Sequence, residues 1–307
     1  MRGNWLGIDT SNYTSSIAVS DASGVILSDK RKLLQVKEGG KGLRQSDALF
    51  QHWDNLPALF EQIPQNYLKD VEGICVSTRP RNVEGSYMPV FKAGISAASL
   101  ISKSLDVPVY EFSHQEGHLL AACIGNEIDF SKKVIFCHFS GGTLEQLLVE
   151  DGEIRIFRAS NDISYGQLLD RIGVDLGYPF PAGKYMDELA MSYTPERLRN
   201  PFCPPYSTKS GLNLSGIENQ LKSAENTMPK EELAYCMMER VAESIKQICE
   251  DAAEETGAQQ VLLAGGVSTS GFIRNYLKGS GFIFAAKEYC SDNAAGLAYS
   301  RGERPWL

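Results

Sequence analysis

The sequence lacks several features that would place it in a specialised class of protein. It has no apolar run of about 18 residues or more and no signal-peptide pattern at its N-terminus. Its seven cysteines are scattered and never form a C-x-x-C pair. Lys and Arg number 30 against 38 Asp and Glu. We therefore expect a cytoplasmic protein with no membrane contact, no disulfide framework and no zinc ribbon.

The acidic balance also limits how the chain can meet nucleic acid. Its net charge is −8, whereas most of the affinity of a nucleic-acid-binding surface comes from Lys and Arg that neutralise phosphates. An RNA substrate would therefore need a local basic patch or a partner subunit.

The length and the apolar content of the chain predict its size class. With 307 residues, 43% of them hydrophobic, it can form two domains with sizeable cores.

The pattern of apolar residues predicts similar elements in both halves of the chain. In the first half we expect strands at 5–8, 14–20, 25–34, 73–78 and 107–110, and helices at 46–63, 89–104 and 114–124. In the second half we expect strands at 134–139, 145–150, 153–158 and 260–264, helices at 164–177, 183–193 and 230–256, and a closing helix near Asp292. This order is typical of a duplicated α/β fold with a cleft between two lobes, at 1–125 and 126–307.

Small polar turns follow the first strand of each half. The turn in 7–16 (GIDTSNYTSS) carries Asp9 and Ser11, and the turn in 140–143 (SGGT) carries two glycines. A further pair, Gly265 and Gly266, follows a buried strand in 264–270 (AGGVSTS). Glycines let the backbone approach a phosphate, and neighbouring N–H and hydroxyl groups can donate to its oxygens. The turns therefore predict a nucleotide site, with Gly265 and Gly266 as the floor for a base or ribose.

Two of the four histidines lie four residues apart in 113–122 (SHQEGHLLAA). On a helix, His114 and His118 would share a face with side chains roughly 6 Å apart, which suits two metal ligands. The alternative is a pair of polar residues that cap and decorate an amphipathic helix, and the pair alone leaves both open. A zinc peptidase of the H-E-x-x-H type is not expected, because Glu116 stands two residues from each histidine and faces another side of the helix.

Seven segments, in order and over nearly the whole chain, carry a resemblance to a known family. They are LGIDTSNYTSSIAV, SHQEGHLLAA, FSGGT, GQLLDRIGVDLGYPFPAG, LNLSGIE, LLAGGVSTSGFIR and CSDNAAGLAY. They resemble the large subunit of the tRNA threonylcarbamoyladenosine synthase, a family also called glycoprotease or O-sialoglycoprotein endopeptidase. The resemblance implies two ribonuclease-H-like lobes of the superfamily that contains actin, sugar kinases and heat-shock chaperones.

The resemblance also implies a reaction and a metal. Members of this family bind threonylcarbamoyl-adenylate, or ATP in its place, and transfer the threonylcarbamoyl group to the adenosine beside the tRNA anticodon. The family's metal ligands match His114, His118 and Asp292, and we expect Asp292 to close the site from the opposite lobe. His138 matches a position where some members have a ligand tyrosine, so it is either a further ligand or a buried strand histidine. Such a ligand set favours zinc or iron over magnesium.

The remaining site residues are carried over from the resemblance one by one. Asp9 and Ser11 are the candidate catalytic residues, Asp9 because it matches an acidic position that orients the metal or its water. The candidate nucleotide-binding residues are Ser140, Gly141 and Gly142 on the phosphates, Asp170, Gly183 and Asp187 on the ribose side, and Gly265, Gly266 and Ser270 near the base. In some members a smaller homologous subunit binds the first lobe, and tRNA would be reached through such partners.

The chain departs from the family pattern at several positions. Thr143 stands in place of a histidine, Leu43-Arg44 in place of Pro-Glu, and Arg79 and Arg81 in place of glycines. These departures indicate a diverged paralogue. Arginines in such a loop can bind a carboxylate or a phosphate through two N–H groups.

The departures leave three alternatives to transfer onto tRNA. The chain could transfer a carbamoyl group to a small acceptor, act as a non-catalytic nucleotide-binding partner protein, or be a kinase or ATPase of the same superfamily. A kinase would use Mg²⁺ and a catalytic aspartate, which a His-His-Asp ligand set does not favour.

Overall fold

The computed structural model describes the chain except residues 1–2, 12, 37–42, 161, 196–198 and 209–210. It divides into two compact units. The first contains Met1–Glu127 and Ser291–Pro305, and the second contains Ile128–Cys290. The boundary between the lobes predicted from the sequence, at residue 125, is close to this division, but that prediction assigned all later residues to the second lobe. The structure differs in that Ser291–Pro305 returns to the first unit.

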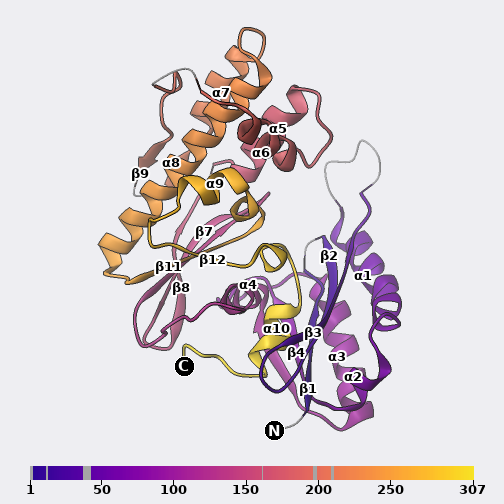
Figure 1. Ribbon diagram of the computed structural model, residues 1–307. Coiled ribbons are helices and arrows are strands. Elements are labelled where there is room, and N and C mark those ends of the chain that lie inside the picture. Colours follow the sequence, from indigo (N-terminus) through magenta and orange to yellow (C-terminus); the bar gives the residue numbers. More distant parts are fainter. Residues whose placement is uncertain (1–2, 12, 37–42, 161, 196–198, 209–210) are drawn as a thin grey trace. The chain divides into compact units, whose positions relative to one another are not determined.

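The first unit is built on a five-stranded sheet with the order β3-β2-β1-β4-β5 (Figure 1). Its strands are β1 (Asn4–Asp9), β2 (Thr14–Ser20), β3 (Ile26–Leu33), β4 (Val71–Arg79) and β5 (Val109–Ser113). The first three strands are antiparallel, whereas β1, β4 and β5 run parallel. The carboxyl ends of β1, β4 and β5 therefore meet at one edge of the sheet, where ligand sites of such sheets lie.

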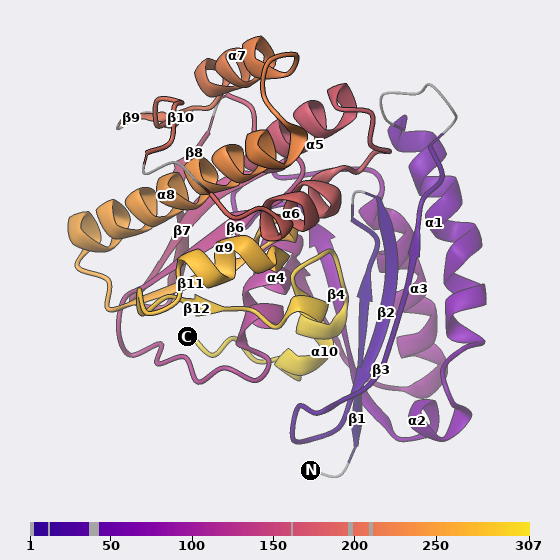
Figure 2. The same cartoon turned by 45° about the horizontal axis from the view of Figure 1, so that its top comes forward.

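Helices cover both faces of this sheet. They are α1 (Gln45–Phe60), α2 (Gln65–Lys69), α3 (Phe91–Leu105), α4 (His114–Cys123) and α10 (Ala295–Ser300). Side chains of β1 alternate between the faces. Leu6 and Ile8 enter the core that also holds Leu56 of α1, while Gly7 faces α10. In Figure 2, α1 and α3 lie on one side of the first sheet and α10 on the other.

The second unit repeats this plan, with the sheet order β12-β11-β6-β7-β8. Its strands are β6 (Val134–Phe139), β7 (Leu144–Glu150), β8 (Glu153–Ala159), β11 (Gln260–Ala264) and β12 (Ile283–Phe284). Its helices are α5 (Tyr165–Asp175), α6 (Gly183–Ser192), α7 (Ser215–Ala224), α8 (Lys230–Thr256) and α9 (Gly271–Tyr276). A short ribbon of β9 (Tyr206–Thr208) and β10 (Gly211–Asn213) and two 3₁₀ turns, Gly266–Thr269 and Lys287–Tyr289, complete it. The 27-residue α8 packs on β6 and β11 through one apolar face.

The repeat expected from the sequence is confirmed. Three antiparallel strands followed by two parallel ones occur in the same spatial order in both units. The sequence interpretation missed α2, α7, α9, β12 and the β9–β10 ribbon, and it began the closing helix near Asp292 rather than at Ala295. Within the described residues, every helix is too short or too polar to cross a membrane.

Candidate metal centre and nucleotide-binding loops

The start of α4 is fixed by a capping box. The Ser113 side chain accepts a hydrogen bond from the Glu116 backbone N–H at 3.1 Å, and the Glu116 carboxylate accepts one from the Ser113 N–H at 2.6 Å. His114 is therefore the first helical residue, and His118 follows one turn later on the same face. Their Nε2 atoms lie 3.0 Å apart. The spacing of the two histidines thus produces a convergent pair.

Asp292 joins this pair from the segment that precedes α10. Its Oδ1 lies 3.6 Å from His114 Nε2 and 3.3 Å from His118 Nε2. The ligand atoms of these three residues all lie within 4.8 Å of one another. Asp292 belongs to the same unit as the histidines, so the expectation that it reaches the site from the opposite lobe is wrong.

Close packing of α10 on α4 brings Asp292 to the histidines. Gly296 of α10 faces the backbone of α4 at Gly117 and Ala121, and the opposite side of α10 touches β1 at Gly7. A side chain at Gly296 would overlap the carbonyl oxygen of Gly117. The position of Asp292 therefore depends on glycines that let two helices approach closely.

A Gly296→Ala variant is expected to lose about 2 kcal/mol of folding stability, because the added methyl group forces α10 away from α4. The same shift moves Asp292 from the histidines, so metal affinity should fall as well. Urea unfolding and metal titration measure the two effects. Gly85→Ala is the control, since its added Cβ meets no described atom within 4 Å, although its positive φ adds modest strain. Equal metal affinities in the two variants would contradict the role of α10.

Asp9, at the end of β1, contacts the Nδ1 side of the His114 ring. Its Oδ2 is 3.3 Å from His114 Nδ1 and accepts a hydrogen bond from Ser11 Oγ at 2.6 Å, while its Oδ1 accepts one from Ser77 Oγ. A carboxylate on Nδ1 keeps the proton there and leaves Nε2 to a metal. Ser77, at the end of the neighbouring β4, is a residue that the sequence interpretation missed. Only the adjacency of β1 and β4 reveals it.

The electrostatics of the cluster favour a positive charge between its carboxylates. Burial lowers the pKa of His114, but Asp9 and Asp292 raise it to about 10. Burial and the charge on His114 lower the pKa of His118. Burial raises the pKa of Asp292, yet the two histidines hold it well below its usual range. A metal ion must displace the proton of His114, so affinity for metal should rise with pH.

The three ligand atoms fit a transition metal. Ligands about 2.1 Å from a tetrahedral zinc ion lie about 3.4 Å apart. The three separations here are 3.0, 3.3 and 3.6 Å. Two imidazole nitrogens and one carboxylate oxygen are typical ligands of zinc and of non-haem iron. The residues present therefore fit the expected metal.

Glu116 has a structural role that explains why it is no peptidase glutamate. Its side chain is 1% exposed and accepts hydrogen bonds from Ser113 N and from Arg304 Nε at 2.8 Å. Arg304 also lies over the Phe112 ring. The Glu116 carboxylate is thus engaged by the helix cap and by an arginine, and it serves the fold.

In the second unit, the predicted phosphate turns lie together at one sheet edge. β6 and β11 are parallel neighbours, so Ser140–Gly142 and Gly265–Gly266 follow adjacent carboxyl ends. The Ser140 side chain accepts from Thr143 N at 3.1 Å, and Ser164 Oγ donates to Gly141 O at 2.9 Å. Cβ atoms added at Gly141, Gly142 or Gly266 would meet no described atom within 4 Å, so this backbone is open to a ligand.

Gly265 is required for another reason. Its φ of 92° suits glycine, and any side chain there would overlap the backbone of Phe139 at the end of β6. Gly265 thus packs directly against the backbone at the end of β6, just before the turn at Ser140.

Asp170 and Gly183 are brought together by a hydrogen bond. Asp170 Oδ1 accepts from the Ala182 N–H at 2.7 Å and from the Gly183 N–H at 3.2 Å, which holds the N-terminus of α6. Burial raises the pKa of Asp170, and these two N–H donors counteract the shift. Both of these hydrogen bonds end on Asp170 Oδ1. A hydroxyl group of a ligand would therefore donate to Asp170 Oδ2.

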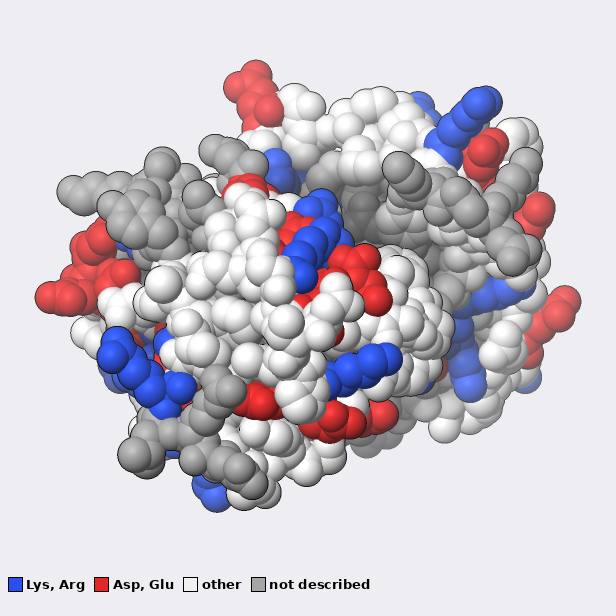
Figure 3. All heavy atoms as spheres, turned by 90° about the horizontal axis from the view of Figure 1, so that it is seen from above, with Lys and Arg blue, Asp and Glu red and all other residues white. Residues whose placement is uncertain are grey.

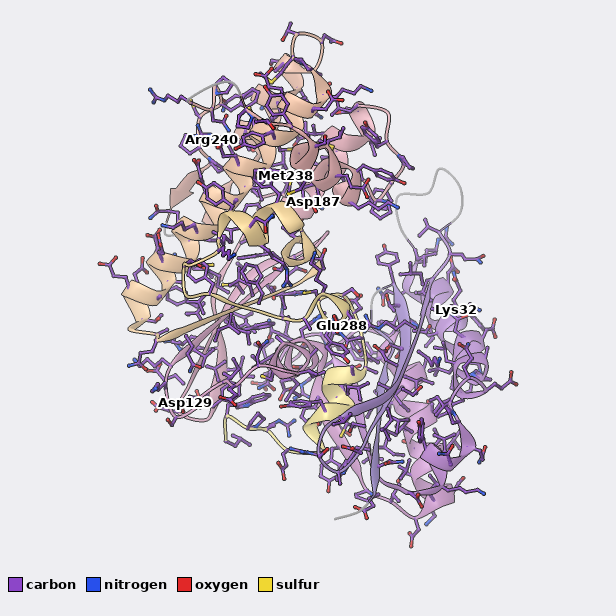
Figure 4. The ribbon with its side chains drawn as sticks, viewed as in Figure 1. Lys32, Asp129, Asp187, Met238, Arg240 and Glu288 are labelled. Atoms are coloured by element: carbon purple, nitrogen blue, oxygen red, sulfur yellow. The ribbon has the colours of Figure 1, made fainter. Side chains whose placement is uncertain are left out.

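Asp187 and Ser270 are direct partners. The Asp187 carboxylate accepts from the Ser270 hydroxyl, from Gly271 N at 2.9 Å and from Phe272 N at 3.0 Å. Ser270 Oγ in turn accepts from Ile273 N at 3.1 Å as the N-cap of α9. Figure 4 labels Asp187 on α6 beside α9. The sequence assigned these residues to ribose and base separately, whereas in the structure they form one pair.

His138 lies on β6 with its side chain on the face opposite the main core. Cys137 and Phe139 enter that core, whereas the His138 ring stacks on Phe136 at a centroid distance of 6.5 Å. The expected alternation along the strand is therefore present. His138 belongs to the second unit and the cluster to the first, and its role as a ligand stays a prediction.

Comparison with known proteins connects this chain with one family. The model of the TsaD family, described as tRNA N6-adenosine threonylcarbamoyltransferase, matches residues 31–299. A tRNA N6-adenosine threonylcarbamoyltransferase of Nanoarchaeum equitans is 26% identical over 96% of this chain and 91% of its own length. One of Neorickettsia sennetsu is 27% identical over 97% and 93%. A probable bifunctional tRNA threonylcarbamoyladenosine biosynthesis protein of Methanothermobacter thermautotrophicus is 27% identical, and the chain spans about half of it, 54%.

Solved structures share the fold at low sequence identity. HypF of T. kodakarensis superimposes with a TM-score of 0.62 at 13% identity, over 98% of this chain and 47% of its own. Component A of the Acidaminococcus fermentans (R)-2-hydroxyglutaryl-CoA dehydratase gives 0.57 at 16% identity, over 97% and 98%. A ROK family glucokinase of Streptomyces griseus gives 0.53 at 15% identity, over 97% and 98%. The fold expected from the sequence, that of actin and the sugar kinases, is confirmed.

Proposed function

Since this chain belongs to the TsaD family of tRNA N6-adenosine threonylcarbamoyltransferases, we propose that it transfers a threonylcarbamoyl group from an adenylate to an adenosine of tRNA. It is a member of a transferase family and not a peptidase. The observation that carries the proposal is the convergence of His114, His118 and Asp292 at the sheet edge where β1, β4 and β5 end.

His114, His118 and Asp292 are proposed to hold one zinc or iron ion. When bound, this ion supplies Lewis acidity to the carbonyl of the transferred group. Asp9 orients the His114 ring, and Ser11 and Ser77 hold the Asp9 carboxylate in place. We retain His138 as a proposed further ligand. In this proposal, Asp9 orients the His114 ring and stabilises its positive charge, and Ser11 supports Asp9 through a hydrogen bond.

The second unit is proposed to bind the adenylate or ATP. The backbone N–H of Gly141 and the Ser140 hydroxyl would donate to the phosphates, with Gly142 in the same open turn, whereas the Ser140 N–H already donates to Thr143 O. Asp170 Oδ2 and the N-terminus of α6 at Gly183 would meet the ribose, next to the Asp187–Ser270 pair. Gly265 and Gly266 would lie beneath the base.

Transfer to tRNA is proposed to require partner subunits. On the face drawn in Figure 3, the described Lys and Arg side chains lie in small groups beside Asp and Glu. A smaller homologous subunit on the first unit fits the exposed side chains of Phe50 and Trp53, which stand on one face of α1. We also propose that the chain works in the cytoplasm, since all seven cysteines, each in the described part, are free thiols.

The proposal is tested by mass spectrometry of digested tRNA from cells whose only member of the family is this chain. We expect threonylcarbamoyladenosine to be recovered, and to disappear when the chain is withdrawn. Unmodified adenosine in cells that express the chain and its partners would contradict the proposal. Bound adenylate in that case would point to a carbamoyltransferase with a small acceptor or to a non-catalytic partner protein.

A further inference from the structure

Arg79 is placed beside the candidate metal centre. It is the last residue of β4 and pairs in register with Ser113, the residue before His114. Two residues earlier on the same strand, Ser77 donates to Asp9. The loop that follows Arg79 also contacts α4, because Gln115 N donates to Pro80 O at 3.1 Å. Arg79 therefore stands at the sheet edge from which the metal ligands arise.

The guanidinium of Arg79 is held in one orientation. Its Nη1 donates to Thr78 Oγ1 at 3.1 Å and its Nη2 to Asn82 Oδ1 at 2.9 Å. Its Nη2 also lies 3.7 Å from Glu116 Oε2. The side chain is still 28% exposed, so part of it can meet a ligand. A guanidinium has five N–H donors in a planar fork, and such a fork suits a carboxylate when it is oriented beforehand.

The charges around Arg79 favour an anion. Glu116 is the carboxylate beside it, and Arg304 Nε binds that same group more closely, at 2.8 Å. One carboxylate thus faces two guanidiniums. In the candidate metal centre, Asp9 and Asp292 together would balance the charge of a divalent ion. Arg79 therefore contributes a positive charge that the neighbouring described carboxylates do not fully compensate.

We propose that Arg79 binds the carboxylate of the threonyl moiety of the donor and so selects threonylcarbamoyl over carbamoyl donors. This inference rests on the proposed function. The two donors differ in that the carbamoyl donor lacks this carboxylate, while the adenylate portion is common to both. A charge-assisted pair of hydrogen bonds gives a preference of about 10- to 100-fold.

Calorimetry with stable sulfamoyl analogues of threonylcarbamoyl-adenylate and carbamoyl-adenylate tests the proposal without acceptor RNA. We expect the wild-type protein to prefer the first analogue by about 10-fold or more. Arg79→Gln should abolish the preference by weakening the threonylcarbamoyl analogue alone, and Arg79→Lys should retain part of it as a point charge. Lys103→Gln, which removes an exposed cation in the last turn of α3, is the control and should bind like the wild type.

Two results would overturn the proposal. One is a wild-type protein without preference between the analogues. The other is an Arg79→Gln variant in which both affinities fall together, because the guanidinium would then act on the shared phosphate region or on the local fold. Failure of the proposed function is distinguishable. A chain that leaves tRNA unmodified but keeps an Arg79-dependent preference would contradict the acceptor and support the carboxylate subsite.

Discussion

Replacing His118 by alanine is expected to abolish binding of the proposed metal ion and to lower the rate of the proposed threonylcarbamoyl transfer about a thousandfold. The variant removes one of the three clustered ligands and leaves His114 and Asp292, with His138 as the one further proposed ligand, so the zinc or iron site is strongly weakened. His118 is almost fully buried on α4, and its ring contacts that of His114 at a centroid distance of 4.4 Å. Elemental analysis of the purified protein and a transfer assay with tRNA measure the two losses.

A matched His138 variant tests by elemental analysis whether His138 is a metal ligand. His138→Ala should lower the metal content if His138 is a fourth ligand, and should leave it unchanged if His138 is a buried strand histidine that stacks on Phe136. Circular dichroism of both variants checks that the fold is retained. A His118→Ala protein that holds one metal ion per chain would contradict the proposed ligand set.

Much of the fold could be predicted because its long elements carry a periodic signal. Strands such as β6 and β11 are largely apolar, and α8 keeps one buried face over 27 residues. Of the elements that were missed, all but the ten-residue α7 have six residues or fewer, and elements as short as α9 and β12 have too few turns or alternations to show a period. Their position is set by tertiary contacts, for example the hydrogen bonds of Asp187 to the start of α9.

The candidate site could be predicted where its chemistry is local. The spacing of His114 and His118 is sufficient to bring two imidazoles together on one helix. Contacts between distant positions were not accessible in the same way. Asp187 and Ser270 are 83 residues apart, and their pairing depends on how α6 and α9 pack. The placement of Asp292 likewise depends on glycines in α4 and α10, whose close approach has no signature in either segment alone.

Glu116→Ala is expected to lower the free energy of unfolding by about 3 kcal/mol. The carboxylate is buried, caps α4 through Ser113 N and binds Arg304. Its removal leaves the Ser113 N–H and the Arg304 Nε–H without their acceptor, while Arg304 Nη2 keeps the Glu111 backbone oxygen. Arg304 is 27% exposed and can recover some hydration, so the estimate lies at the low end for a broken buried pair. Urea unfolding measures the loss.

Two further variants separate the parts of this effect. Glu116→Gln keeps an oxygen for the Ser113 N–H but loses the charge, so it should cost about half as much as the alanine variant. Glu111→Ala, on the neighbouring strand β5, should stay within about 0.5 kcal/mol of the wild type, because the Glu111 backbone oxygen that receives Arg304 is unchanged. A Glu116→Ala protein as stable as Glu111→Ala would contradict the structural role. A glutamate that served as the general base of a metallopeptidase would show the reverse pattern, with chemistry lost and stability retained.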